Sequence, residues 1–177
     1  MMMAAAALTD CEVERRTVLV RASFENGVSA SLATLAGTLA RSGAKVAVIA
    51  GFGDPSDDIN PALSLRRFVE PLAAATGVPV AFIAESVGCG AEAGLDKVGF
   101  GHIALLENLR FHSSRHRDAR SFALKLSVLG DFFVDAGSPL NTPSAGTNGW
   151  QNHLRVLLPA PDLSAFTDIE TECSEEV

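Results

Sequence analysis

Five short, almost uninterrupted apolar runs alternate with segments of helical periodicity along this chain. The runs are TVLVRA (17–22), KVAVIA (45–50), VPVAFIA (78–84), HIALLE (102–107) and DFFVDA (131–136). Strands that are covered on both faces have this composition, and they form parallel sheets. The helical segments between them are 29–43, 63–77, 85–99 and 119–130. The order predicts an α/β fold, a doubly wound (Rossmann-like) parallel sheet with right-handed crossovers. We expect five strands, or six if HLRVLL (153–158) adds one.

The expected helices carry apolar residues at helical spacing, such as Leu32, Leu35 and Leu39. Three of these segments end on a glycine, at the position where a left-handed residue commonly ends a helix. These glycines are Gly43, Gly77 and Gly130.

Size and charge limit the classes of function. The chain has 177 residues, 47% of them hydrophobic and 20% charged, which suits one globular domain. Its net charge of −7 argues against a nucleic-acid partner, because a polyphosphate backbone would be repelled. No apolar run approaches the roughly 20 residues that span a bilayer, so we expect no membrane partner. The start, MMMAAAALTDCEVERR, lacks a basic region before its apolar run. We therefore expect a cytoplasmic protein with free thiols.

We divide the chain into three parts: an N-terminal extension (1–16), the α/β domain (17–159) and an acidic C-terminal tail (160–177). The segment GSPLNTPSAGTN (137–148) is rich in turn residues and predicts a long loop. From Pro161 onward the tail has no Lys or Arg, which predicts a mobile or docking segment. Its acids are Asp162, Asp168, Glu170, Glu172, Glu175 and Glu176.

Several segments occur together in a familiar order: VLVRASFENG, GAKVAVIAGFGDP, SLRRFVEPLAAATGVPVAFIAESVG, IALLENLRFH and FFVDAG. Across roughly residues 17 to 147 they resemble the N-terminal domain of the phosphoglycerate kinase family. The resemblance implies a doubly wound sheet that binds 3-phosphoglycerate, or the 1,3-bisphosphate, in a basic patch. It also implies that a second domain binds ATP or ADP with magnesium, and that closure of the two domains allows phosphoryl transfer.

The family's substrate-binding positions can be placed on this sequence one at a time. Its Asp-Phe-Asn after the first strand corresponds to Ser23-Phe24-Glu25, and the arginine expected on the next helix falls at Val28 or Ala30. Its His-Leu-Gly-Arg-Pro after the second strand corresponds to the stretch from Gly51 to Pro55, with Asp54 in place of the arginine. The arginine of ENLRF is present as Arg110. The family's Thr-Ala-His-Arg falls in residues 140–143, which have no basic residue.

The vestigial substrate positions are therefore Ser23, Glu25, Gly51, Asp54 and Arg110, and two of them carry negative charge. Like charges about 4 Å apart repel by roughly 4 kcal/mol at an effective dielectric of 20. One charge-assisted hydrogen bond from Arg110 offers only about 1.5–3 kcal/mol. We expect the family's ligand to bind poorly or not at all. We expect Arg110 to form a structural ion pair with Glu107 or Asp135, and we favour this over a remaining anion site.

These departures favour a truncated, non-catalytic pseudoenzyme that acts as a binding or structural component of a larger assembly. The alternative is that the chain is the substrate-binding half of a phosphoglycerate kinase, which transfers a phosphoryl group between 1,3-bisphosphoglycerate and ADP. A third hypothesis is a weak small-anion ligand at Arg110. We expect no catalytic residue, because no nucleophile lies in a recognisable constellation. We expect no cofactor either, and Mg-ATP only if a separate nucleotide domain exists.

A basic stretch between residues 110 and 125 stands out on an acidic chain. Its docking candidates for an acidic protein partner are Arg115, Arg117, Arg120 and Lys125. The alternative is a solvated helix start.

Other local patterns favour structural interpretations. His112 and His116 have a spacing that can ligate metal, but no third ligand accompanies them, so we expect no metal site. GFGDPS (51–56) resembles a dinucleotide loop, although Pro55 and two aspartates separate it from the next helix. Cys89 could be a reactive thiol at a helix start, but we favour a cysteine without a chemical role. Trp150, the only tryptophan, anchors the C-terminal segment or lies in an interface.

Overall fold

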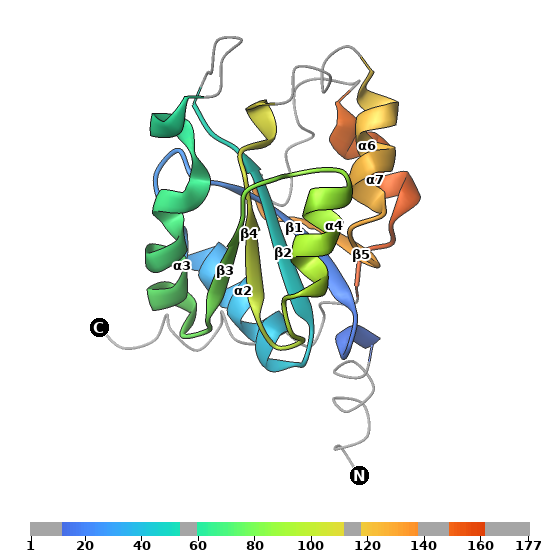
Figure 1. The fold of residues 1–177 in the computed structure, drawn as a ribbon. Helices are drawn as coiled ribbons and strands as arrows, with labels where there is room; N and C mark the ends of the chain where they lie inside the picture. The colour runs from blue at the N-terminus through green and yellow to red at the C-terminus, as the bar shows by residue number, and fades with distance from the viewer. Residues whose placement is uncertain (1–11, 54–59, 112–117, 138–148, 162–177) are drawn as a thin grey trace, which may run out of the picture.

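The computed structural model describes residues 12–53, 60–111, 118–137 and 149–161, and every structural statement below concerns these residues. Five parallel strands form one sheet (Figure 1). They are β1 (Thr17–Ser23), β2 (Lys45–Gly51), β3 (Val80–Ile83), β4 (Ile103–Leu106) and β5 (Phe132–Asp135). Their order across the sheet is β3-β4-β2-β1-β5, and all four pairings are parallel. The predicted fold class is confirmed.

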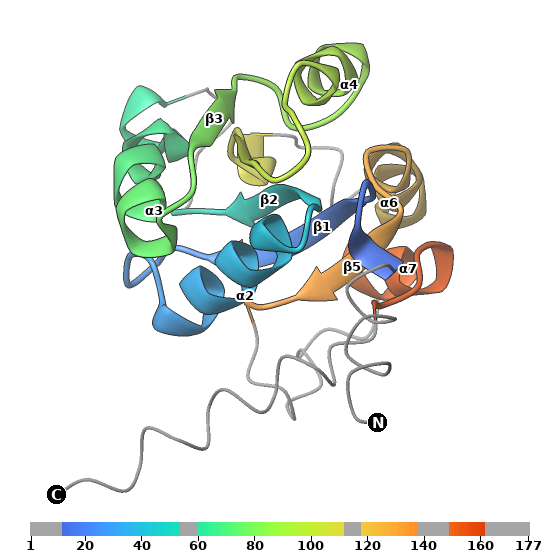
Figure 2. The same cartoon turned by 90° about the horizontal axis from the view of Figure 1, so that it is seen from below.

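Helices cover both faces of the sheet (Figure 2). One layer contains α2 (Ala30–Arg41) and α3 (Val69–Thr76), and the other contains α4 (Cys89–Asp96), α6 (Ala119–Ser127) and α7 (Trp150–Leu157). Three short 3-10 helices lie between strands: η1 (Pro61–Leu63), η2 (Leu65–Phe68) and η3 (Leu109–Phe111).

Alternate residues of the central strands supply two separate cores. Val18 and Val20 of β1 pack against the α2–α3 layer, whereas Leu19 packs against the layer of α4, α6 and α7. Because both faces are covered, the buried side chains of β1 and β2 are apolar on both sides of the sheet, except for Lys45 at the start of β2. This explains why the strand segments are continuous apolar runs in the sequence.

The expected sixth strand at 153–158 is wrong, because most of this segment belongs to helix α7. Trp150 and Leu154 are buried one helical turn apart, and Leu158 packs against the same core. Beyond the helix, the Pro159 carbonyl accepts a hydrogen bond of 3.0 Å from the N–H of Phe133. The chain therefore covers part of the outer edge of β5 without forming a strand of the sheet.

Two of the three predicted glycine caps have left-handed backbone, with φ of 87° at Gly43 and 69° at Gly77. Gly130 does not, so that prediction is wrong. A Cβ atom at Gly130 would lie 2.9 Å from Leu19 Cγ and 3.2 Å from the Thr17 carbonyl oxygen. Glycine at 130 allows the chain to pass close to β1 instead. Within the described part of the chain, no helix is long and apolar enough to cross a membrane.

Candidate anion site at the carboxyl edge of the sheet

The carboxyl ends of β2 and β4 form the topological switch point of this sheet. The two strands are neighbours, but the chain leaves β2 toward β3 on one side and leaves β4 toward β5 on the other. Ligands of open α/β sheets bind in the crevice at such a point. Gly51 is the last residue of β2, and Arg110 lies in η3, directly after β4. The sequence-predicted positions 51 and 110 therefore come together where this fold class holds a ligand.

Arg110 is engaged by neighbouring groups of its own chain. Its guanidinium donates a hydrogen bond from Nη1 to the Gly53 carbonyl, and the same nitrogen lies 3.8 Å from Glu25 Oε1. Glu25 Oε1 also accepts a hydrogen bond of 3.3 Å from the Gly53 N–H. The side chains of Arg110 and Glu25 are 40% and 49% exposed, so the ion pair is partly screened by water. The pair nevertheless cancels the net positive charge that an anion would need.

The absence of a side chain at position 51 shapes this arrangement. A Cβ atom built on Gly51 would lie 2.9 Å from Arg110 Nε and 3.0 Å from Arg110 Cγ. The stem of Arg110 thus occupies the space that a side chain at position 51 would take. In the family pattern this position is a histidine, so the family's residue and this placement of Arg110 exclude each other.

The expected partners of Arg110, Glu107 and Asp135, are engaged elsewhere, and that prediction is wrong. Glu107 accepts hydrogen bonds from the Ser64 hydroxyl (2.7 Å) and the Leu65 N–H (3.0 Å). Asp135 lies on β5, 3.0 Å from Arg21 and 2.8 Å from Arg155. Among the described residues, the acid that pairs with Arg110 is Glu25, which follows β1.

Asn108 is a structural residue that inspection of the sequence missed. It is fully buried, and its side chain is hydrogen-bonded on both the donor and the acceptor side. Its amide nitrogen donates to the carbonyls of Phe52 (2.8 Å) and Leu63 (2.9 Å), and its oxygen accepts from the N–H groups of Phe52 and Arg110 (both 3.0 Å). Asn108 therefore ties the end of β2 to η1 and η3, and it sets the backbone position of Arg110.

An aromatic cluster lies near the carboxyl edge, on the side of α2 and α3. The rings of Phe24 and Phe68 stack with centroids 4.6 Å apart, and Phe52 meets Phe68 edge to face at 5.2 Å. The guanidinium of Arg67 lies 5.9 Å from the centroid of the Phe52 ring. Arg67 is an exposed cation beside this cluster that the family pattern does not predict.

The remaining predicted substrate and docking positions are spread over the fold. Ser23 is exposed at the end of β1, and Arg120 and Lys125 are exposed on α6. Asp54, Arg115 and Arg117 lie outside the described residues, as do His112 and His116 of the metal hypothesis. In the ranges that the structure describes, no group of three His, Cys, Asp or Glu side chains could hold a metal ion.

The start of α6 is held by an aspartate cap. Asp118 accepts hydrogen bonds from both the hydroxyl and the N–H of Ser121, the latter at 3.0 Å. These two hydrogen bonds lower the pKa of Asp118 from its ordinary value of 3.8. The cap also accounts for the one acid in the basic stretch.

Two weaker sequence patterns have simple positions. Cys89 is exposed as the first residue of α4. In the GFGDPS pattern, the next helical turn of the described chain is the 3-10 helix η1, and the α-helix begins only at Val69. Within the described ranges, no α-helix N-terminus that could meet a dinucleotide lies close after Gly53.

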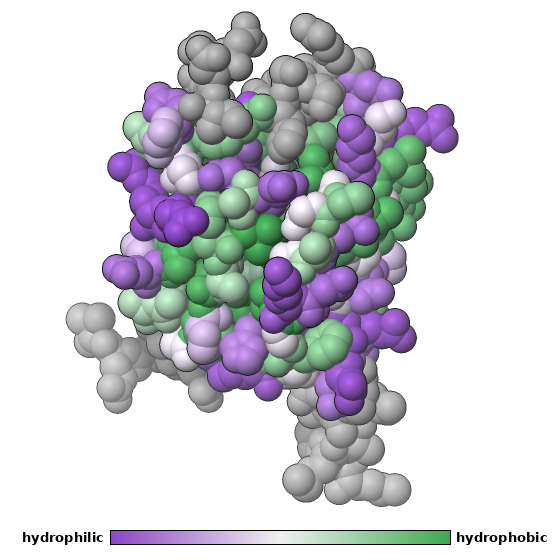
Figure 3. Space-filling model, viewed as in Figure 1, coloured by the Kyte–Doolittle hydropathy of each residue, from purple (hydrophilic) through white to green (hydrophobic). Residues whose placement is uncertain are grey.

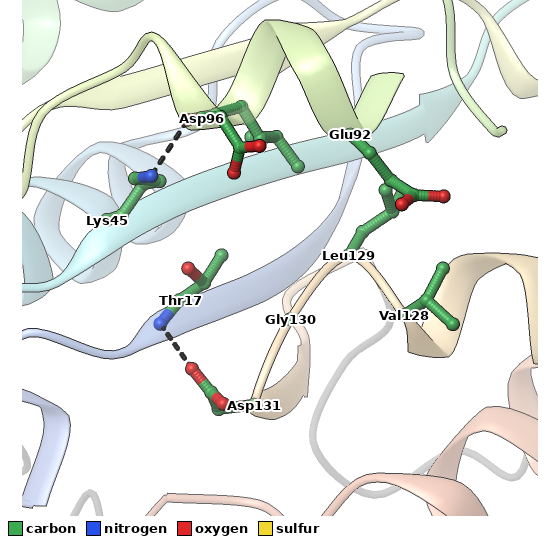
Figure 4. Close-up of a pocket in the computed structure, with 9 residues that line it drawn as sticks. Thr17, Lys45, Glu92, Asp96, Val128, Leu129, Gly130 and Asp131 are labelled. Carbon is green, nitrogen blue, oxygen red and sulfur yellow. Dashed lines mark hydrogen bonds between the residues drawn. The ribbon is translucent and has the colours of Figure 1, made fainter. Parts of the chain in front are cut away.

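A pocket of about 260 Å³ lies at the opposite, amino edge of the sheet, between α4 and the end of α6 (Figure 4). Its lining includes three acids, Glu92, Asp96 and Asp131, and one lysine, Lys45. Lys45 donates a hydrogen bond of 2.8 Å to the Leu95 carbonyl, and Asp131 accepts one of 2.9 Å from the Thr17 N–H. The acidic lining does not suit a phosphate or carboxylate ligand.

Comparisons with known proteins match the geometry of the fold. The computed structure superposes on the crystal structure of phosphoglycerate kinase from Pyrococcus horikoshii OT3 with a TM-score of 0.66 and 20% sequence identity. The match covers 93% of this chain and 45% of that one. At this identity the likeness concerns the fold.

Sequence comparisons are more specific. The chain is 40% identical over 134 residues to phosphoglycerate kinase of Caulobacter vibrioides, which covers 75% of this chain and 33% of that protein. It is 38% identical over 158 residues to phosphoglycerate kinase of Rhodospirillum centenum, which covers 83% of this chain and 40% of the relative. The chain thus spans between a third and two fifths of the length of these relatives. The family model described as phosphoglycerate kinase matches residues 8–154, and this chain belongs to the phosphoglycerate kinase family.

Proposed function

We propose that this chain is a non-catalytic member of its family, a pseudoenzyme that serves as a binding component of a larger assembly. The observation that carries the proposal is the engagement of Arg110 by Gly53 and Glu25. In the family pattern, positions 25 and 51 hold an amide and a histidine. Here they hold an acid beside Arg110 and a glycine whose space Arg110 fills.

Magnitudes support weak or absent binding of a phosphorylated three-carbon acid. A hydrogen bond to a charged group contributes about 1.5–3 kcal/mol, and even millimolar affinity requires about 4.1 kcal/mol. Arg110 must also give up its contact with Glu25 before it can contact a ligand. Among the described residues, Arg67 is a further cation near this edge, but it lies over the ring of Phe52 and outside the family's set of substrate positions.

A coupled kinase assay with Mg-ATP and 3-phosphoglycerate tests the absence of catalysis. We expect no turnover above background for the full chain. Turnover that is lost in Arg110→Ala, and kept in the matched variant Arg67→Ala, would refute the proposal.

The binding role is expected to use the cations of α6, because Arg120 and Lys125 are exposed on an acidic chain. Copurification from cell extract with an acidic protein should be reduced by Lys125→Glu. The same charge change at Lys97, which is exposed at the end of α4, should have little effect. Equal loss in both variants, or no copurifying protein, would count against a partner at α6.

The second candidate function is the substrate-binding half of a two-part phosphoglycerate kinase. The retained arginine at the switch point favours it. In that case the nucleotide and magnesium would bind to the other part. Activity that appears only when a separate nucleotide domain is added, and only with Arg110 intact, would support this candidate.

A further inference from the structure

The large apolar side chains that remain exposed are concentrated on two adjacent helices. Among the described residues, five are exposed, and four of them lie on α6 and α7 or directly at the end of α6. They are Leu124 (46% exposed), Val128 (65%), Val156 (86%) and Leu157 (40%). Figure 3 shows green surface on the side of the molecule where α6 and α7 lie. We call these four residues the α6–α7 face.

The two helices form one unit with similar direction. The rings of Phe122 and Trp150 meet edge to face with centroids 5.7 Å apart, near the start of each helix. After its end, α7 leads to Pro159, which bonds to Phe133 at the start of β5. Because α6 also ends just before β5, the last turns of both helices lie toward the amino edge of the sheet. Val128, Val156 and Leu157 therefore lie at the same end of the helix pair.

The charge on these helices is positive, in contrast to the rest of the chain. Arg120 and Lys125 are exposed on α6, and Arg155 is exposed on α7. The acid at the start of α6, Asp118, caps the helix, and α7 contains no acid. Apolar side chains beside cations fit an occupant that is itself apolar and acidic.

The C-terminal tail of this chain has that composition. From residue 162 onward it carries six acids and no Lys or Arg. Its large apolar residues Leu163, Phe166 and Ile169 recur every third position, which would place them on one side of a helix. The tail follows Pro161, which is buried, directly after the segment that bonds to the outer edge of β5. Arg155 of α7 reaches Asp135 of the same strand, so the last described residues of the chain lie next to β5 and α7.

We propose that residues 162–176 dock on the α6–α7 face of their own chain. Leu163, Phe166 and Ile169 contact the apolar side chains, and the acids lie near Arg120 and Lys125. A second copy of the chain fits this face less well, because a two-fold contact would bring its cations together. The docking of the tail does not depend on the proposed binding role. If that role is correct, a tail on this face would compete with an acidic partner for Lys125.

A spin label on the native Cys173, in a full-length chain carrying Cys11→Ser and Cys89→Ser, tests the docking without any partner or ligand. We expect the label to broaden the amide NMR signals of α6 and α7 and to leave α2 and α3, on the opposite layer, sharp. Lys125→Glu should remove most of this broadening. Lys97→Glu, which changes the charge equally at an exposed position at the end of α4, should preserve it.

A mixture of spin-labelled chain without nitrogen-15 and unlabelled chain with nitrogen-15 identifies intermolecular contact. The signals in this mixture are compared with those of a chain that carries both the spin label and nitrogen-15. Equally strong broadening in the mixture would mean that the tail contacts a second copy, and it would overturn the proposal. Broadening that is absent, lies on other elements, or responds equally to both lysine variants would also overturn it. None of these outcomes depends on whether the carboxyl edge binds a substrate.

Discussion

Asn108 and Arg110 belong to the same ENLRF motif, yet they have different roles in the structure. The buried Asn108 bonds to the backbone of Phe52, Leu63 and Arg110, so it connects the segment after β4 to the end of β2 and to η1. Arg110 is the position to which the family resemblance assigns substrate binding, and here it contacts Gly53 and Glu25. The ENLRF motif is therefore better evidence for the fold than for ligand binding.

Replacing Asn108 tests its structural role. Asn108→Ala leaves several backbone groups at the end of β2 and in η1 without a partner, and each buried unsatisfied group costs about 1–3 kcal/mol. We expect the free energy of unfolding to fall by roughly 2–4 kcal/mol in urea denaturation. The control Asn26→Ala, at an exposed position after β1, should change it little. A loss for Asn108→Ala no larger than that of the control would contradict the network.

Removing the charge of Glu25 should partly restore attraction for anions. Two unit charges 4 Å apart interact by about 1 kcal/mol in water, so we expect Glu25→Asn to strengthen binding of 3-phosphoglycerate about fivefold. Chemical-shift titration measures the change even when both affinities are weak. Glu70→Gln removes an exposed acid on α3 and should leave the affinity unchanged. An equal effect of the two variants would mean that Glu25 has no local role.

The sequence was sufficient to predict that Arg110 forms an internal ion pair, but not with which acid. Glu107 and Asp135 were plausible because both lie at strand ends. Glu25 faces Arg110 because the segment after β1 folds over Gly53, whose N–H bonds to the same carboxylate. That proximity depends on loop geometry and on the missing side chain at position 51, which periodicity does not encode.

At the scale of the elements, the ionised carboxylate of Asp118 caps the start of α6, so its contribution to stability depends on pH. The pKa of Asp118 is lowered in the folded state by the hydrogen bonds from Ser121. Stability from a lowered carboxyl pKa is present above the unfolded value of 3.8 and is lost as the pH falls through the folded value. We expect Asp118→Ala to lower the Tm near neutral pH, and the difference from wild type to shrink below pH 3.8.

Thermal unfolding followed by circular dichroism over this pH range measures the effect. Asp96→Ala, at the exposed last residue of α4, is the control and should show a smaller difference near neutral pH. A difference for Asp118→Ala that stays constant down to low pH would contradict a role for the ionised cap.

Helix α7 illustrates how a short segment misleads a pattern analysis. Within 153–158 the apolar residues are dense enough to suggest a strand, but the informative spacing is that of Trp150, Leu154 and Leu158. Residues four apart lie on one side of a helix. The helical spacing is therefore visible in the sequence only when the segment is taken to begin at Trp150.

A matched pair of substitutions on α7 tests its packing. Leu154 is fully buried, so Leu154→Ala should lower the free energy of unfolding by about 2–5 kcal/mol. Val156 is 86% exposed, and Val156→Ala should change it by no more than about 0.5 kcal/mol. Denaturant unfolding compares the two, and similar losses would mean that α7 is not packed as described.

For the whole molecule, the strands of the sheet could be predicted from the sequence. The contacts of Arg110 at the carboxyl edge could be predicted only in part. All five strands lie within two residues of the predicted ranges, because double burial leaves continuous apolar runs. The conformation of loops at the carboxyl edge decides whether Arg110 is available to a ligand. Those loops depend on contacts between β1, β2 and β4 that are distant in sequence.

Isothermal titration calorimetry of the full chain with 3-phosphoglycerate tests most directly whether the switch point still accepts the family's ligand. We expect heats no larger than those of dilution, or binding no tighter than millimolar, with no difference between wild type and Arg110→Ala. Binding in the micromolar range that disappears in Arg110→Ala would contradict the account.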